Sequence, residues 1–371
     1  MIIVGGCYRE LCESPLWNCV LGSGGRAAVV LAGLAPNVQL VTYRPEFLRQ
    51  DLYPIEVQRV SVTAQPSATE VVFSYLHPLS QPAIVPRSIT KEDPLLVDGE
   101  LVLRFGMIEG DAIVTAKRAV YDPQNALPSG FTANGSKAEQ LAVVLNELEL
   151  RQLGKSEDIH VAANHIMKAD NAAVVVAKCG VKGAWVFALN GPPQWVSAYR
   201  SSSIFKIGTG DVFSAVFAYH WMCRDVASVE AATLASQSVA AYAASRIVPV
   251  PQVDGRDLRP IGLSNSRVVV LGDATTLADR WLREEAVSRL MDLGVNVRTA
   301  TANTLPTGGR LLLLADGLPG AAASIVSNAI AAGLFVVVFQ QRNALPAEQS
   351  ASVQYTDDFT TALYWIAWGN A

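Results

Sequence analysis

A short glycine-rich motif in the second half of the sequence, Ile207–Phe213, could carry out phosphoryl-transfer chemistry. Its two glycines let the backbone turn sharply and let a ligand approach the main chain closely. If a helix begins here, the backbone N–H groups of Gly208, Thr209 and Gly210 are free donors that can bind a phosphate. Asp211 would repel that phosphate, but it has a role if it takes the proton from a hydroxyl that attacks the phosphorus. An ordinary turn in which Asp211 caps the helix explains the same residues.

Four segments, in their order along the chain, resemble motifs of the ribokinase-like (PfkB) family of sugar and nucleoside kinases. These segments are Gly22–Ala28, Asn146–Glu149, Lys178–Gly183 and Gly208–Asp211. The resemblance covers about residues 1–250. It implies an enzyme that uses ATP and Mg²⁺ to phosphorylate a hydroxymethyl group on a sugar or nucleoside, with Asp211 as the general base. It also implies that the amides of Gly208, Thr209 and Gly210 form the anion hole for the transferred group.

The resemblance assigns further residues to the nucleotide and the metal. Asn146 and Glu149 correspond to positions that bind the phosphates and Mg²⁺, Glu149 through a water molecule, and oxygen ligands suit this ion. An exposed helix start with a solvated glutamate is the plainer alternative. Lys178, Gly180 and Gly183 belong to a strand turn on the nucleotide side, although a lysine at a strand end is ordinarily just solvated.

The substrate-binding residues depart from the family pattern. Gly24 and Gly25 match its glycine pair, but the asparagine that commonly follows and helps to hold the sugar is replaced here by Arg26 and an alanine. An arginine in the pocket favours an anionic or strongly hydrogen-bonding substrate, whereas in the plainer alternative it points to solvent or to a lid carboxylate. We expect Glu10 to take over binding of the sugar hydroxyls and Tyr75 to contact the substrate from the lid.

The elements around these residues follow an α/β pattern, in which ligands bind at the carboxyl ends of strands. The run 172–178 is continuously apolar, as expected for a buried parallel strand. We expect further strands at 1–6, 112–114, 120–123, 184–189 and 203–207, and helices at 27–34, 138–145 and 231–245. The resemblance therefore implies a three-layer α/β/α domain.

Residues 56–86 have a different pattern. Polar and apolar residues alternate over 57–63 and 70–75, with proline-rich turns between and after them. Alternation of this kind predicts strands with one wet face. By resemblance they belong to a β-lid, inserted at about 40–100, that covers the sugar and pairs with a second subunit, so we expect a homodimer or a higher homo-oligomer.

The last third of the chain predicts a second domain. A proline-containing polar linker, 251–265, precedes a new series of apolar strands and helices that indicates a doubly wound parallel sheet. Residues 266–371 resemble the nucleoside 2-deoxyribosyltransferase-like fold, but Ser324 stands where that family carries its nucleophilic glutamate. A serine without a base cannot replace a carboxylate that attacks an anomeric carbon. We therefore expect no transferase chemistry, and either nucleoside binding or an interface role.

Composition narrows the possibilities further. The 371 residues have a formal charge of −4 and no basic cluster, which argues against nucleic acid as a partner. The five cysteines form no Cys-x-x-Cys pair, and no signal peptide or membrane span is evident, so we expect a cytoplasmic protein. Two alternatives to a sugar kinase stay open: a nucleoside or nucleotide kinase regulated by a nucleoside on the C-terminal domain, and a non-catalytic nucleotide sensor or assembly subunit.

Overall fold

The computed structural model describes most of the chain, which divides into two compact units. Unit 1 comprises Met1–Leu76, Gln81–Ser201 and Lys206–Pro260, and unit 2 comprises His77–Ser80, Ser202–Phe205 and Ile261–Ala371. Among the described residues, no helix is both long enough and apolar enough to cross a bilayer. The described residues are 1–45, 47, 52–125, 127–189, 191–252, 254–262, 267–300, 305, 308–342 and 350–370.

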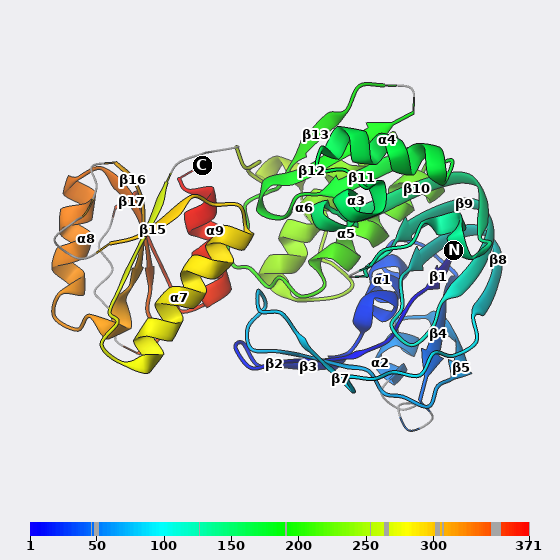
Figure 1. Cartoon of the computed structure of the whole chain (residues 1–371), viewed down its shortest axis with the longest axis horizontal. Coiled ribbons are helices and arrows are strands. Elements are labelled where there is room, and N and C mark those ends of the chain that lie inside the picture. The colour runs from blue at the N-terminus through cyan, green and yellow to red at the C-terminus, as the bar shows by residue number, and fades with distance from the viewer. Residues whose placement is uncertain are drawn as a thin grey trace. The chain divides into compact units, whose positions relative to one another are not determined.

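A nine-stranded sheet forms the centre of unit 1 (Figure 1), in the order β13-β12-β11-β10-β9-β8-β1-β4-β5. The seven strands from β5 to β11 are parallel, and β12 and β13 pair antiparallel at one edge. All seven parallel strands therefore end at the same edge. The strands are β1 Ile2–Val4, β4 Val38–Arg44, β5 Val60–Pro66, β8 Leu95–Phe105, β9 Ala112–Asp122, β10 Lys137–Asn146, β11 Val174–Lys178, β12 Gly183–Ala188 and β13 Gln194–Ser197.

Helices cover both faces of this sheet, which makes the three layers predicted from the sequence. Helices α3 and α4 pack on β10 and β11, whereas α1, α5 and α6 pack together on the other face. The helices of unit 1 are α1 Gly22–Ala32, α2 Tyr53–Glu56, α3 Glu147–Gly154, α4 Ile159–Ala169, α5 Thr209–Ala218 and α6 Ser228–Ser245.

Three elements differ from the sequence prediction. Residues 138–145, expected to be helical, form strand β10 in the middle of the sheet. Their side chains at 141–145 are all buried, so the alternation that would reveal a strand is missing. The two short strands expected at 112–114 and 120–123 are one continuous strand, β9. The strand expected at 203–207 is absent, and these residues lead directly into α5.

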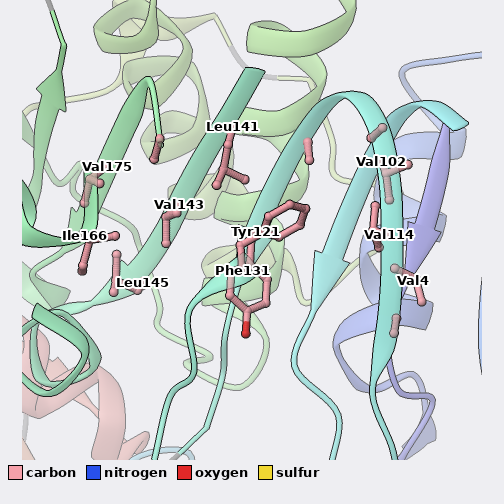
Figure 2. Close-up of a cluster of buried hydrophobic side chains, with 14 of the residues drawn as sticks. Val4, Val102, Val114, Tyr121, Phe131, Leu141, Val143, Leu145, Ile166 and Val175 are labelled. Carbon is pink, nitrogen blue, oxygen red and sulfur yellow. The ribbon is translucent and has the colours of Figure 1, made fainter. Parts of the chain in front are cut away.

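The core on the α3–α4 face joins side chains from the strands to those of the two helices (Figure 2). Val143 and Leu145 of β10 are fully buried there, and Ile166 of α4 is 2% exposed. Burial of each such side chain contributes about 1.5–3 kcal/mol to folding. This packing holds the strands whose carboxyl ends carry the candidate site residues.

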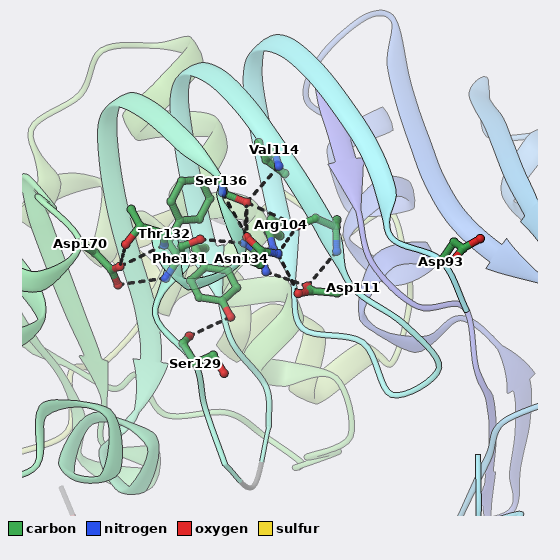
Figure 3. A network of polar contacts seen from close by, with 12 residues as sticks. Asp93, Arg104, Asp111, Val114, Ser129, Phe131, Thr132, Asn134, Ser136 and Asp170 are labelled. Carbon is green, nitrogen blue, oxygen red and sulfur yellow. Dashed lines mark hydrogen bonds and ion pairs between the residues drawn. The ribbon is translucent and has the colours of Figure 1, made fainter. Parts of the chain in front are cut away.

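A polar network crosses this core near the starts of β9 and β10 (Figure 3). The buried Arg104 guanidinium donates to Oδ1 of Asp111 at 2.7 Å and to the carbonyl oxygen of Phe131 at 3.1 Å. Asp170, at the end of α4, accepts hydrogen bonds from the backbone N–H groups of Phe131 and Thr132 and from the Thr132 hydroxyl. The network thereby fixes the loop between β9 and β10.

A separate four-stranded sheet has the order β3-β2-β6-β7, and two of its strands, β6 and β7, lie in the segment predicted to be the lid. Its strands are β2 Arg9–Cys12, β3 Trp17–Val20, β6 Val72–Tyr75 and β7 Ala83–Val85. The predicted lid boundaries, 40–100, were therefore wrong. β4 and β5 belong to the nine-stranded sheet, and so does most of the strand expected at 57–63, because β5 pairs in parallel with the buried β4. Residues 9–20, which precede α1, supply half of the small sheet.

Unit 2 contains a five-stranded, fully parallel sheet in the order β15-β14-β16-β17-β18. Helices α7 and α9 cover one face and α8 covers the other (Figure 1). This is the doubly wound α/β arrangement expected from the sequence. The elements are β14 Val268–Gly272, α7 Leu277–Asp292, β15 Val297–Thr299, β16 Gly309–Leu314, α8 Ala322–Ala331, β17 Leu334–Phe339, β18 Val353–Thr356 and α9 Phe359–Trp368. Part of the predicted linker, at 253 and 263–265, and the predicted domain start at 266 lie outside the described residues.

Candidate active site

Three polar side chains lie at the carboxyl ends of neighbouring parallel strands. Asp122 ends β9, Asn146 ends β10 and Lys178 ends β11, and Asn146 is in register with Lys178. The carboxyl edge of a parallel sheet is where α/β proteins bind ligands. The fold therefore brings together residues that are far apart in the sequence.

The Gly208–Asp211 loop opens helix α5. Gly208 is the N-cap residue, and its φ of +79° lies in the left-handed region that glycine adopts most easily. A side chain at this position would overlap the guanidinium group of Arg26. Position 208 therefore requires glycine for two reasons, and the loop lies directly against a buried cation.

Asp211 is held by two donors. Its Oδ2 accepts a hydrogen bond from Nη1 of Arg26 at 2.7 Å, and its Oδ1 accepts one from Nε2 of Gln124 at 2.6 Å. The residue is 8% exposed. Asp211 lies in the first turn of α5, where the helix dipole also favours a negative charge.

Arg26 connects the catalytic candidate to the small sheet. Its guanidinium group, which is completely buried, forms an ion pair with both carboxylate oxygens of Glu10 in β2. Burial opposes the charge, but Glu10, Tyr242 and Asp211 raise the pKa of Arg26 well above its usual value. Nε of Arg26 donates to the hydroxyl of Tyr242, which donates to the carbonyl oxygen of Ile207 at 2.9 Å. Arg26 thus points to neither solvent nor an open pocket.

Lys178 forms a second ion pair, which is partly buried. Its Nζ lies 2.6 Å from Oδ2 of Asp122, which also accepts a hydrogen bond from the Ser214 hydroxyl. Burial raises the pKa of Asp122, although Lys178 counteracts this effect, and the Asp122 charge helps to raise the pKa of Lys178 against the effect of burial. A Cβ added at Gly210 would lie 3.7 Å from Nζ of Lys178, so this ammonium group lies beside the loop at the start of α5.

Asn146 and Glu149 form a capping box at the start of α3. Oδ1 of Asn146 accepts from the Glu149 N–H at 2.9 Å, and Oε2 of Glu149 accepts from the Asn146 N–H at 2.8 Å. Glu149 is buried, and burial together with the Asp122 charge raises its pKa to about 7. The two residues therefore have a structural role in addition to the metal role implied by resemblance. Within the described ranges no group of three metal-ligating side chains occurs.

A cavity of about 470 Å³ lies over the loop and the small sheet. Of the predicted site residues, Glu10, Tyr75, Gly208, Gly210 and Asp211 line it. Burial and the Glu10 charge raise the pKa of Tyr75, so its hydroxyl stays protonated. The apolar and aromatic part of its lining comes from the small sheet and from the loops before β2 and after β8: Tyr8, Phe73, Ile84, Met107 and Ile108. The cavity thus combines an apolar wall with a polar floor.

The remaining predicted site residues do not line this cavity. Gly24 packs against the backbone of Gly5 at the end of β1, where a side chain would collide, and Gly25 packs against Ile55. The two residues that precede this glycine pair, Gly22 and Ser23, line the cavity instead. Gly180 and Gly183 bound the turn that joins β11 to β12.

Gln124 and Lys206 are two of the lining residues that the sequence analysis missed. Gln124 lies two residues after the end of β9, and a polar turn that follows a parallel strand is a signal that could have identified it. Its φ of +43° is uncommon for a residue other than glycine and directs its amide toward Asp211. Lys206 lies in segment 203–207, which was predicted to be a strand, so only the structure of this loop identifies it as a cavity residue.

Comparisons with known proteins agree with this architecture. Residues 116–250, which contain the strand ends and the Gly208–Asp211 loop, match the family described as pfkB family carbohydrate kinase. A search of curated protein sequences found no match.

Two solved structures are similar in fold. One is the ribokinase of Arabidopsis thaliana complexed with ribose and ATP, with 14% identity, a TM-score of 0.50, and 65% of this chain and 91% of that chain covered. The other is a sulfate complex of a pyrophosphate-dependent kinase in the ribokinase family, with 14% identity, a TM-score of 0.50, and coverage of 65% and 94%. At this identity the likeness concerns the fold alone. The chain thus combines the ribokinase-like fold with a central segment that is similar to the pfkB family of carbohydrate kinases.

Proposed function

We propose that this protein is a carbohydrate kinase that transfers the γ-phosphoryl group of ATP to a hydroxymethyl group on a sugar or nucleoside. One observation carries the proposal: Asp211 lines a cavity at the start of α5, directly after the Gly208–Gly210 loop. A carboxylate beside an anion-binding loop is the arrangement that phosphoryl transfer to an alcohol requires.

In the proposed reaction the substrate hydroxyl lies against Asp211. Its oxygen forms a bond to the γ-phosphorus, the bond from phosphorus to the β–γ bridging oxygen breaks, and the hydroxyl proton passes to the Asp211 carboxylate. Arg26 and Gln124 hold this carboxylate in place before the substrate arrives. The amides of Gly208 and Gly210 stabilise the negative charge on the transferred group. Thr209, predicted as a third donor, is engaged instead, because its N–H donates to the Lys206 carbonyl oxygen at 3.2 Å.

Oxygen donors at the strand ends fit Mg²⁺. Bound with the ATP phosphates, this ion would neutralise developing charge. Oδ1 of Asp122 is buried, with no hydrogen-bond partner among the described residues, and the Asp122 charge helps to raise the pKa of Glu149. Because Asn146 and one oxygen of Glu149 are engaged in the capping box, we propose that Glu149 acts through water, as Mg²⁺ commonly retains several waters. Lys178 would bind the donor phosphates from the end of β11.

A screen of ADP release against pentoses, hexoses and nucleosides tests the proposal. With the best acceptor, Asp211→Asn should lower kcat by at least about 10²-fold and leave KM for ATP nearly unchanged. Asp98→Asn, at an exposed position of β8, is the matched control. Wild-type turnover by the Asp211→Asn variant would exclude Asp211 as the base. No ADP release with any acceptor would favour a nucleotide sensor or assembly subunit.

We also propose that the small sheet contributes to a homodimer. Its edge and turns expose large apolar side chains, with Leu16 85% and Val85 52% exposed. An apolar group of this kind favours association. Analytical ultracentrifugation should show a dimer that Leu16→Lys/Val85→Lys converts to a monomer, and a wild-type monomer would exclude this interface.

For unit 2 we propose a nucleoside 2-deoxyribosyltransferase-like fold without transferase activity. Ser324 lies exposed on α8, and its hydroxyl donates to the carbonyl oxygen of Ala321 at 2.8 Å. Asp316, at the end of β16, accepts from the N–H groups of Gln341 and Arg342. Neither residue has the features of an activated nucleophile. Release of free base from a deoxynucleoside by the full chain would contradict this, and a nucleoside that changes kinase turnover would support regulation through unit 2.

A further inference from the structure

Lys206 is a cation whose charge is not balanced within the cavity. Its Nζ donates to Oγ1 of Thr209 at 3.1 Å, and in the described part of the chain it forms no ion pair. The two acids that line the cavity, Glu10 and Asp211, are both ion-paired with Arg26. Lys178, the nearby ammonium group, is ion-paired with Asp122.

The Lys206 side chain is fixed at the first turn of α5. The Thr209 hydroxyl donates to the Lys206 carbonyl oxygen at 2.9 Å while it accepts from Lys206 Nζ, so side chain and loop hold each other. Lys178 Nζ lies near Gly210 in the same turn. Two ammonium groups therefore lie close to the residues of the predicted anion hole.

The surroundings of Lys206 disfavour its charge when no anion is present. Burial lowers its pKa, the positive charge of Lys178 lowers it further, and Asp211 acts in the opposite direction. Asp211 is itself held by Arg26. A bound phosphate would supply the negative charge that this environment lacks, and would stabilise the ammonium form.

We propose that Lys206 binds the phosphoryl group being transferred and completes the anion site of Gly208–Gly210. The ligand class is a phosphate of a polyphosphate donor, bound by one free ammonium group and the loop amides together. The inference rests on the proposed kinase function, but it predicts anion binding separately from turnover. A lysine that only fixed Thr209 would support folding and leave anion affinity unchanged.

The test uses the full chain and inorganic pyrophosphate as the probe, with binding measured by isothermal titration calorimetry. Lys206→Met should weaken pyrophosphate binding at least about tenfold and lower kcat with ATP by about 10²-fold. Lys206→Arg should retain most of the binding. Lys117→Met, at an exposed position of β9, is the control and should behave as wild type.

Two further readouts separate binding from a structural role. Without ligand, Lys206→Met should unfold at the wild-type temperature or above, because a partly buried charge without an ion-pair partner among the described residues is removed. Wild-type pyrophosphate affinity should fall as pH rises through a value below 10.5, whereas that of Lys206→Arg should not. Unchanged pyrophosphate affinity in Lys206→Met, or no pyrophosphate binding by the wild type, would overturn the inference. Absence of any phosphorylated acceptor would count against the kinase function alone.

Discussion

Arg26 and Asp211 form a buried ion pair in which Nη1 of the arginine lies 2.7 Å from Oδ2 of the aspartate. The same guanidinium group also binds Glu10, so Arg26 of α1 links Glu10 of the small sheet to Asp211 of α5. This arrangement is the basis for proposing that Arg26 positions Asp211.

Replacing Arg26 should affect stability and activity separately. Arg26→Met leaves the Glu10 and Asp211 carboxylates without their cation and should lower the free energy of unfolding by about 3–5 kcal/mol in urea titrations. Adding Glu10→Gln should restore much of this loss without restoring kcat, because Asp211 still lacks its donor. Wild-type turnover by the double variant would contradict the positioning role.

Arg26→Lys tests the geometry of the same group. The guanidinium group donates from three separate nitrogens to Tyr242, Glu10 and Asp211, whereas the three N–H donors of an ammonium group sit on one atom and do not match this spread of acceptors. We expect a folded protein with kcat reduced about tenfold or more, measured by ADP release at saturating substrate.

Gln124 should matter for turnover more than for stability. Gln124→Ala removes the donor to Oδ1 of Asp211, and we expect a kcat lowered about tenfold with a change in unfolding free energy of less than about 1 kcal/mol. Gln140→Ala, at an exposed position of β10, is the control. Equal kcat values for the two variants would show that Asp211 does not depend on this amide.

The raised pKa of Glu149, about 7, gives a pH dependence with a defined sign. Between pH 4.5, the ordinary value, and pH 7 the folded chain keeps a proton that the unfolded chain releases, so this group makes the fold less stable as pH rises. Glu149→Gln should therefore be more stable relative to wild type at pH 8 than at pH 5 in chemical denaturation.

Glu149 should also control the Mg²⁺ requirement. Only its ionised form attracts the cation, so the Mg²⁺ concentration for half-maximal activity should fall as pH rises through about 7 in the wild type. The dependence should be absent in Glu149→Gln. A variant that keeps the wild-type Mg²⁺ profile would mean that the residue serves only as the cap of α3.

Asp170 should be structural and remote from the chemistry. Its carboxylate accepts three hydrogen bonds from Phe131 and Thr132 (Figure 3), so Asp170→Ala leaves these donors unpaired and should cost about 3 kcal/mol of stability. KM and kcat measured well below the lowered melting temperature should stay at wild-type values. An equal loss of kcat would mean that the loop it fixes reaches the active site.

The parts of the site that depend on local sequence could be predicted, and those that depend on tertiary contacts could not. The start of α5 at Gly208–Asp211 follows from two glycines before an apolar helix. β10 was mistaken for a helix because Val143, Val144 and Leu145 are buried on both faces, where strand and helix patterns look alike. The partners of Arg26, which lie 16, 185 and 216 residues away, are set by the fold alone.

The absence of a side chain at position 208 has an evolutionary consequence. Because a Cβ there would occupy the space of the Arg26 guanidinium, the two sites constrain each other's substitutions across 182 positions of sequence. Homologues that carry an arginine or lysine at position 26 should retain glycine at position 208. Shortening the side chain at position 26 first removes the clash and leaves only the strain of the left-handed backbone at position 208, whereas alanine at position 208 first produces an intermediate with both the clash and the strain. In an alignment of relatives, substitutions at positions 26 and 208 should therefore occur together.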